Sequence, residues 1–195
     1  MTETILAWHW LRLDMRSGHG DELPWRIGET RTCSSEISLC GNGYPHSPTP
    51  YDGVQYAPGP VLCRVEASVP VEGDSSKSVS RTITLISAQN MERELRLFAC
   101  ECAEQELERE RAKGQEPDPC SWAAIEVARR YALGEATDEE LYTAWVAAWA
   151  AIDTKEAAGE ATIKAARAAR AVASTPAWRA VRMAQTNEEE QWQRE

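Results

Sequence analysis

Alternating apolar and polar positions in the first 90 residues predict β-strands. The clearest stretch is residues 61–68, where every second side chain is apolar: Val61, Cys63, Val65 and Ala67. A period of two places such side chains on one face of a half-buried strand. Residues 79–86 alternate more loosely, and residues 5–11 form a further apolar segment. We therefore expect three strands in a small, mainly antiparallel sheet.

Glycine and proline mark the connections between these segments. The run Gly41-Asn42-Gly43 is typical of a tight turn. Three prolines follow it within a few residues, so residues 45–50 are expected to form an irregular loop.

The apolar positions change to a helical spacing after residue 90. Met91, Leu95, Phe98 and Cys102 recur every three or four residues, and Gly114 is expected to end that helix. Ser121 is the expected N-cap of a second helix, which would run through Leu133 and end at a glycine.

Two more helix starts are expected further along the chain. The sequence Thr137-Asp-Glu-Glu140 is a capping box. The apolar face of the helix that it opens comprises Leu141, Trp145, Ala148, Trp149 and Ile152. Thr175-Pro176 is expected to open a last helix, since proline suits the first helical position.

Composition divides the chain in the same way. Residues 1–90 hold seven of the 10 prolines and eight of the 11 glycines, whereas residues 121–184 include 22 alanines. Alanine favours helix because it loses no side-chain entropy there. We predict an α+β protein with a β-rich domain over residues 1–88 and a helical domain of about five helices over residues 89–195.

The amino-terminal sequence, the short apolar runs and the six cysteines indicate in which cellular compartment the protein is found. Glu3 and Arg12 leave no room for a secretory apolar segment, and no apolar run approaches the ~20 residues that a membrane span needs. We expect a protein of the bacterial host cytoplasm with reduced thiols. Cys100 and Cys102 cannot hold one metal ion together, because residues two apart point away from each other on a helix. No metal site is expected.

Charge is separated along the helical half, and the chain carries a formal net charge of −10. Between residues 101 and 118 there are seven acids and three bases, and Glu101, Glu104 and Glu108 are our candidate contacts for a basic protein surface. Residues 161–187 contain no acid and five bases, which offers an alternative nucleic-acid site at Lys164, Arg167, Arg170, Arg179 and Arg182. The two segments could also pack together as helices with complementary charges.

One part of the chain resembles a known domain. Leu39 to Gly43, and then the run YAPGPVLCRVE at residues 56–66, resemble an uncharacterised domain of tailed phages, prophages and some actinobacteria. The likeness covers about residues 5–90, and the alanine-rich region resembles an extension that often follows that domain. Family members read Gly-Leu-His-Ala-Ser where this chain has Gly-Tyr-Pro-His46-Ser, so the histidine is displaced by one position.

A second resemblance concerns the order of strand, turn and strand around the YAPGP run. It is similar to small ADP-ribosyltransferase-like folds, in which a histidine on the first strand and a later tyrosine bind NAD. This resemblance nominates His9 and Tyr56 as catalytic residues and Glu66 as an acidic third member, with NAD as the cofactor.

These observations lead to one preferred function and two alternatives. We expect a phage-type accessory protein that binds a host protein or complex with a basic surface, without a cofactor and without catalysis. An inhibitor of a nucleic-acid-binding defence complex, similar to anti-CRISPR or anti-restriction proteins, fits this description, because carboxylates can occupy sites meant for phosphates. The alternatives are the NAD-consuming enzyme and direct nucleic-acid binding.

Overall fold

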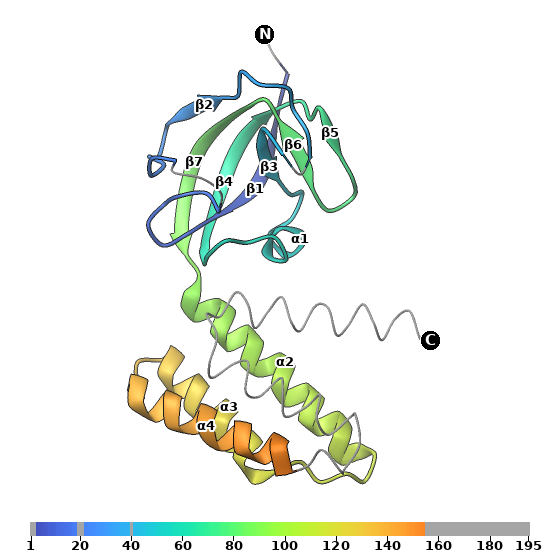
Figure 1. Cartoon of the computed structure of the whole chain (residues 1–195), viewed down its shortest axis with the longest axis vertical. Coiled ribbons are helices and arrows are strands. Elements are labelled where there is room, and N and C mark those ends of the chain that lie inside the picture. Colours follow the sequence, from blue (N-terminus) through green and yellow to red (C-terminus); the bar gives the residue numbers. More distant parts are fainter. Residues whose placement is uncertain (1–2, 19–21, 40, 155–195) are drawn as a thin grey trace. The chain divides into compact units, whose positions relative to one another are not determined.

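The computed structural model describes residues 3–18, 22–39 and 41–154. The chain divides into two compact units, Met1–Met91 and Glu92–Glu195. Antiparallel sheets form most of the regular structure of residues 4–90, and helices follow within residues 92–154 (Figure 1). The predicted α+β class is therefore confirmed.

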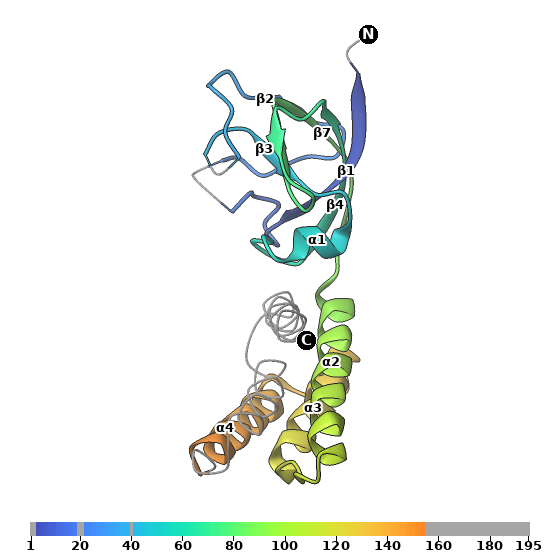
Figure 2. The ribbon, with the colours of Figure 1, turned by 90° about the vertical axis from the view of Figure 1, so that its right-hand side faces the viewer.

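The first unit contains two antiparallel sheets. One has the strand order β1-β4-β7-β2, and the other has the order β3-β6-β5. The strands are β1 (Thr4–Leu11), β2 (Thr30–Thr32), β3 (Tyr44–His46), β4 (Val61–Ser68), β5 (Glu72–Gly73), β6 (Ser78–Ser80) and β7 (Thr82–Asn90). Figure 2 shows the smaller sheet beside the larger one.

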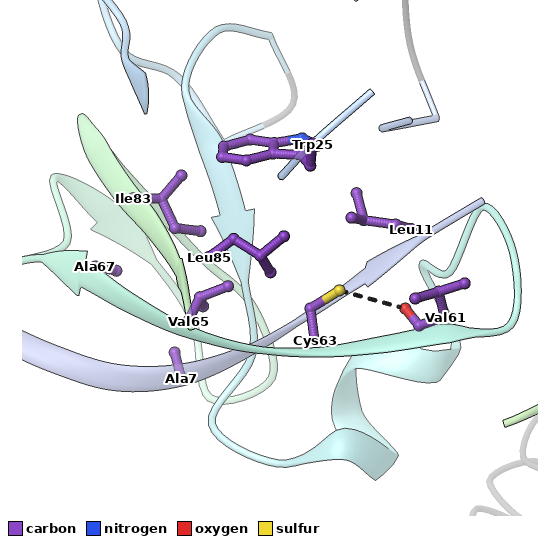
Figure 3. Packing of buried hydrophobic residues seen from close by; sticks show 9 residues of the cluster. All are labelled: Ala7, Leu11, Trp25, Val61, Cys63, Val65, Ala67, Ile83 and Leu85. Carbon is purple, nitrogen blue, oxygen red and sulfur yellow. Dashed lines mark hydrogen bonds between the residues drawn. The ribbon is translucent and has the colours of Figure 1, made fainter. Parts of the chain in front are cut away.

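The core of this unit lies on one face of the larger sheet (Figure 3). The alternation in β4 is confirmed, since Cys63, Val65 and Ala67 are at most 1% exposed. β4 lies between β1 and β7, so its inward side chains meet those of both neighbours. The cluster comprises Ala7, Leu11, Trp25, Val61, Cys63, Val65, Ala67, Ile83 and Leu85.

The single strand predicted over residues 79–86 is wrong, because the chain changes sheets at Arg81. β6 ends at Ser80 and pairs with β3, whereas β7 begins at Thr82 and pairs with β4. The guanidinium of Arg81 donates to the carbonyls of Cys33 (2.9 Å) and Ser35 (3.1 Å). These distant acceptors hold the chain at the point where it passes between the sheets.

The irregular loop predicted over residues 45–50 is also wrong. Residues 44–46 form β3, and Pro50–Val54 form the short helix α1. Thr49 caps this helix by accepting from the backbone N–H of Asp52 (3.1 Å). Pro50 suits the first helical position because no intrahelical acceptor exists there for a backbone N–H. The hydrogen-bonded turn predicted at residues 41–43 lies earlier, since Gly41 N–H donates to the Ser38 carbonyl at 3.1 Å. Residues 41–43 bend toward β3, and Gly43 adopts a φ of +112° that favours glycine.

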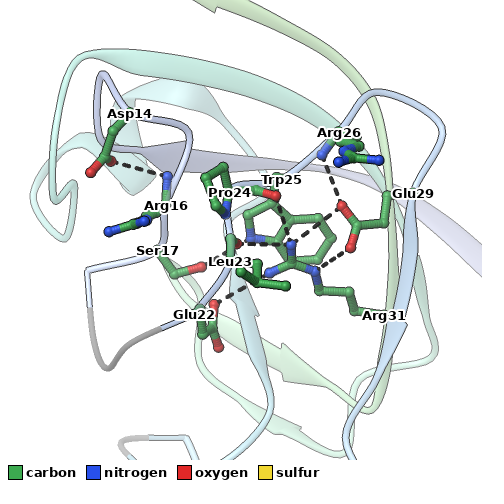
Figure 4. A network of polar contacts seen from close by, with 10 residues as sticks. All are labelled: Asp14, Arg16, Ser17, Glu22, Leu23, Pro24, Trp25, Arg26, Glu29 and Arg31. Atoms are coloured by element: carbon green, nitrogen blue, oxygen red, sulfur yellow. Dashed lines mark hydrogen bonds and ion pairs between the residues drawn. The ribbon is translucent and has the colours of Figure 1, made fainter.

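Arg31 on β2 anchors the long loop between β1 and β2 (Figure 4). Its guanidinium pairs with Glu29 (2.7 Å) and donates to the carbonyls of Leu23 (2.9 Å) and Pro24 (3.1 Å). It also lies 3.9 Å from the ring centre of Trp25, which is buried in the core. A planar, delocalised cation can make all these contacts at once, so one side chain fixes a loop that has little regular structure.

The second unit begins with α2 (Glu92–Ala112), α3 (Pro119–Ala132) and α4 (Asp138–Thr154). α3 packs against both α2 and α4. α2 and α3 are each followed by a glycine with positive φ, Gly114 (+80°) and Gly134 (+78°), as predicted. The later helix expected from Thr175 lies outside the described residues.

The helix starts confirm one predicted cap and correct another. At α4, Thr137 N–H donates to the Glu140 carboxylate (2.8 Å) and the Glu140 N–H donates to the Thr137 hydroxyl (3.2 Å), which is the predicted capping box. At α3, the N-cap is Asp118 rather than Ser121, and it accepts from Cys120 N–H at 2.8 Å. Ser121 is buried within the helix instead.

Candidate functional site

Two histidines lie close to the point where the sheets of the first unit meet. Trp8 and Ser47 exchange two backbone hydrogen bonds (2.9 and 2.8 Å), which join β1 to the residue after β3. Since antiparallel strands run past each other, His9 on β1 lies beside His46 on β3. The Nδ1 of His9 is 2.7 Å from the carbonyl oxygen of Pro45, so this nitrogen carries the proton and donates it.

His46 belongs to a buried chain of hydrogen bonds. Its Nε2 is 2.8 Å from the hydroxyl oxygen of Ser80, and this hydroxyl donates to the carbonyl of Ser68 at 2.6 Å. Because the serine proton is used in that second bond, His46 Nε2 must be the donor in the first. The chain of bonds therefore links β3, β6 and the end of β4, and the serine is not activated as a nucleophile.

Burial keeps both imidazoles neutral. Loss of hydration lowers the pKa of His9 to about 4, although its hydrogen bond to Pro45 acts in the opposite direction. Burial also lowers the pKa of His46 to about 4, helped by the nearby His9. The Nε2 of His9 is buried and has no hydrogen-bond partner among the described residues. The two neutral imidazoles can therefore hold the strands together at neutral pH.

The three residues that the resemblance nominates for NAD chemistry, His9, Tyr56 and Glu66, do not share one site among the described contacts. Tyr56 is 47% exposed, its hydroxyl is 3.3 Å from that of Ser76, and Lys77 Nζ lies 4.7 Å from its ring centre. Glu66 accepts from the Thr4 hydroxyl at 2.7 Å. Because His9 is paired with Cys63, three residues from Glu66 on β4, the side chains of His9 and Glu66 point to opposite faces of the sheet. No described contact joins His9 to Tyr56.

The two tryptophans of β1 share a face but differ in exposure. Trp10 is 5% exposed, and its indole N–H donates to the carbonyl of Pro50 on α1 (3.3 Å). Trp8 is half-buried, with the guanidinium of Arg64 at 4.6 Å from its ring centre. Trp10 therefore fixes α1 on the sheet, and Trp8 remains partly accessible.

In the second unit, α2 carries the three candidate carboxylates in two different settings. Glu101 and Glu108 are exposed, and Glu108 is bonded to Arg111 at 3.1 Å. Glu104 instead pairs with Arg129 of α3 at 2.7 Å, and this hydrogen bond raises the pKa of Arg129. Glu104 thus joins two helices, whereas Glu101 and Glu108 face solvent.

The exposed carboxylates belong to a longer row along α2. We call this set the acidic row, and it comprises Glu94, Phe98, Glu101, Gln105 and Glu108, all of them exposed. The steps of four and three residues place these side chains on one side of the helix. Phe98 lies between Glu94 and Glu101 in this row and is 41% exposed. The opposite side of α2 is buried and includes Ala99, Cys100, Ala103 and Leu107.

Negative charge exceeds positive charge throughout this part of the unit. Residues 92–154 contain 15 acids and seven bases. Six of these bases already pair with carboxylates of the same unit: Arg96, Arg109, Arg111, Lys113, Arg129 and Arg130. Glu94 and Glu101 form no ion pair with any residue that the structure describes. The surplus carboxylates of the acidic row are therefore available to a cationic partner.

No family model, curated protein or solved structure matches the chain. The resemblances to the phage-associated domain and to ADP-ribosyltransferase-like folds stay predictions. The alternative nucleic-acid residues Lys164, Arg167, Arg170, Arg179 and Arg182 lie outside the described part of the chain. Within that part, no three His, Cys, Asp or Glu side chains are grouped to hold a metal ion, and no helix is both long and apolar enough to cross a bilayer.

Glu94 and Phe98 are the contact residues that we did not select from the sequence. Both continue the spacing of Glu101 and Glu108 toward the start of α2, so the helical period alone could have indicated them. The signal for Phe98 was misleading, because its apolar spacing placed it with Met91 and Leu95 on the expected buried face. Phe98 is exposed because the opposite side of α2, which includes Ala99 and Ala103, is the buried one.

Proposed function

We propose that the protein acts by binding another protein, without chemistry of its own, and that the acidic row of α2 contacts a basic surface on that partner. The observation that carries this proposal is the exposed Phe98 between the unpaired carboxylates of Glu94 and Glu101. An aromatic side chain provides apolar contact area, and the charges around it select a cationic partner. A row with only carboxylates would lack such an anchor.

The internal ion pairs support the same proposal. Acids outnumber bases by 15 to seven over residues 92–154, and six of those bases pair with carboxylates other than Glu94 and Glu101, so these two exposed acids keep an uncompensated negative charge. Complementary charge accelerates the encounter between two proteins by long-range attraction. The hydrogen bonds of the buried histidines join strands, which favours binding rather than catalysis for this chain.

The class of partner is inferred from the carboxylates of the acidic row and from the resemblance to a phage-associated domain. A row of carboxylates on a rigid helix can occupy a surface that normally binds phosphates. We propose a nucleic-acid-binding host protein or defence complex in the bacterial cytoplasm, inhibited in the manner of anti-CRISPR or anti-restriction proteins. Its basic surface would be blocked by the acidic row.

A charge-reversal experiment tests the proposal. The tagged full chain, the variant Glu101→Lys/Glu108→Lys and the variant Phe98→Ala are used to capture proteins from nuclease-treated host lysate. The matched control is Glu3→Lys/Glu36→Lys, which changes the net charge equally at two exposed acids of the first unit. We expect the wild type and the control to retain one dominant protein, and both α2 variants to lose it.

Affinity measurements with the captured protein separate the outcomes. Binding should weaken steeply between about 50 and 200 mM salt for the wild type, because exposed charges are screened over about 10 Å at 0.1 M salt. Equal capture by the wild type and Glu101→Lys/Glu108→Lys would contradict the role of the row. Partners that vanish with nuclease would favour direct nucleic-acid binding. NAD cleavage abolished by His9→Ala in a folded chain would favour the enzyme.

A further inference from the structure

The outer face of the larger sheet carries a row of side chains that crosses three strands. Trp8 of β1 is paired with Arg64 of β4, and Arg64 is paired with Ser87 of β7. Residues directly opposite each other in a sheet point to the same side. The core lies on the other side, since Cys63 and Val65 flank Arg64 along β4 and belong to the core cluster. We call the set of Trp8, Arg64 and Ser87 the Arg64 row.

The guanidinium of Arg64 has donors that the described residues do not use. It lies 4.6 Å from the ring centre of Trp8, and both side chains are half-buried. Among the described residues, no ion pair or hydrogen bond engages the Arg64 side chain. The half-buried Arg31 differs, because its guanidinium pairs with Glu29 and donates to two carbonyls. Arg64 is therefore a cation with free N–H donors, positioned by an aromatic ring.

The acid on the same face of β4 does not neutralise this cation. Glu66 follows Arg64 by two residues, but it accepts from the Thr4 hydroxyl at 2.7 Å and forms no described ion pair with Arg64. Ser87 is exposed beside Arg64 and adds a hydroxyl donor. A carboxylate has two oxygens and one negative charge, which match a planar guanidinium. A doubly charged phosphate would be repelled more strongly by Glu66.

Apolar side chains lie on both sides of the row. Leu6 precedes Trp8 by two residues on the same face and is 59% exposed. Ile86 is 42% exposed and precedes Ser87, where the register between β4 and β7 shifts. An open sheet face covers a small molecule incompletely, whereas ligand pockets bury most of their ligand. A protein segment can cover the whole row and also contact the apolar side chains around it.

We propose that the Arg64 row binds a carboxylate of a protein partner, namely an aspartate or glutamate side chain that lies between apolar residues. The guanidinium of Arg64 donates two parallel N–H bonds to the carboxylate, and the Ser87 hydroxyl donates a third. Leu6 and Ile86 contact the apolar neighbours of that acid. This surface selects a negative group, whereas the acidic row of α2 selects a positive one, so the inference does not depend on the proposed function.

An NMR titration of the isotope-labelled full chain tests this site. The probes are acetyl-Leu-Glu-Leu-amide and its uncharged match, acetyl-Leu-Gln-Leu-amide. We expect the Glu peptide to shift the resonances of Arg64 Nε–H and the Trp8 indole N–H, and to bind about fivefold more tightly than the Gln peptide. Arg64→Gln should remove this preference. Arg64→Lys should keep only part of it, because the charge remains but the planar fork is lost.

The matched control is Arg26→Gln, which removes the charge of an exposed arginine in the same unit and should leave the preference unchanged. The amide resonances of β4 show whether each variant keeps its sheet. Ser87→Ala leaves the contact between Arg64 and Trp8 in place, and it should weaken binding of the Glu peptide about threefold.

Several results would overturn the proposal. These are equal affinities for the two peptides, no shift with either peptide, and an unchanged preference for the Glu peptide in Arg64→Gln with its sheet intact. Inorganic phosphate or acetate that binds as tightly as the Glu peptide would also overturn it, because the row would then be a site for free anions.

Discussion

At the scale of single residues, His9 and His46 couple the first unit to pH. Each has its folded-state pKa lowered from 6.5 to about 4. The folded protein therefore binds these protons less readily than the unfolded chain does, so stability is greatest above pH 6.5. It is lost progressively as the pH falls from 6.5 to 4, and below 4 the histidine contribution changes no further.

The first prediction concerns this pH dependence. For one histidine with these two pKa values, the free energy of unfolding should fall by about 2 kcal/mol between pH 7.5 and pH 5. Urea unfolding of the wild type and of His9→Asn, measured at both pH values, checks it. The variant should lose less stability on acidification, because its amide is not protonated in this range and its nitrogen occupies the place of Nδ1, from which it can donate to the Pro45 carbonyl. Equal losses in both proteins would contradict the assignment.

The second prediction concerns two thiols. Burial raises the pKa of Cys63 to about 12 and that of Cys100 to about 11. Their sulfurs face the carbonyls of Val61 and Ile125. Since the thiolate is the reactive form, we expect both to resist iodoacetamide at pH 8, whereas the less buried Cys33, Cys102 and Cys120 are alkylated earlier. Peptide mapping after short labelling measures the order, and early labelling of Cys63 would show that the core opens.

At the scale of elements, alternation and helical spacing predicted most of the fold. β4 and the helices α2 to α4 follow from local patterns, because each buries one face along its length, and β1 follows from its run of apolar residues. The break at Arg81 did not follow, since it depends on carbonyls almost 50 residues away. The cap of α3 was misassigned because Asp118 and Ser121 are both good N-cap residues, and only the position of Pro119 distinguishes them.

The candidate surface was predictable to a similar degree. The excess of acids over residues 101–118 indicated Glu101 and Glu108, and both are exposed on α2. The role of Glu104 depends on Arg129, which another helix brings to it. A sequence pattern within α2 carries no information about that contact.

The third prediction tests the capping box of α4. Thr137→Ala removes the hydroxyl that accepts from Glu140 N–H, and we expect a loss of about 1 kcal/mol. The Thr137 backbone N–H, and then its hydroxyl, lower the pKa of Glu140, so the variant should also raise that pKa. Carboxyl titration by NMR measures the second effect, and urea unfolding followed by circular dichroism measures the first.

Thr143→Ala is the control for this substitution. Thr143 is exposed within α4, and alanine has the higher helix propensity, so stability should be kept or slightly raised. A similar loss in both variants would show that the cap itself contributes little.

At the scale of the whole molecule, the net charge approaches zero in the same pH range in which the two histidines reduce the stability of the first unit. The isoelectric point of about 4.9 lies where protonation of His9 and His46 weakens the first unit. Repulsion between molecules is then smallest, and most of the stability that depends on the two histidines has already been lost. Acid conditions should therefore promote association of partly unfolded chains.

The fourth prediction follows from this coincidence. Light scattering against pH should be greatest near pH 5 and low at pH 7, where the net charge is −10. Glu3→Lys/Glu36→Lys makes the net charge less negative, so its maximum should move to higher pH. A maximum that stays at the same pH in this variant would indicate that net charge does not control association.

The position of β7 in the larger sheet also has a consequence for synthesis on the ribosome. β7 is the last strand of the first unit to be made, and it alone pairs β2 with the rest of the sheet. Until residue 90 has emerged, β1 and β4 can form only a two-stranded ribbon, which is marginally stable in water. The nascent chain thus exposes the apolar side chains of Val61, Val65 and their neighbours until β7, residues 82–90, has left the ribosome. The helices that follow can form from local contacts as soon as they emerge, so the first half of this chain is the part that most needs a chaperone.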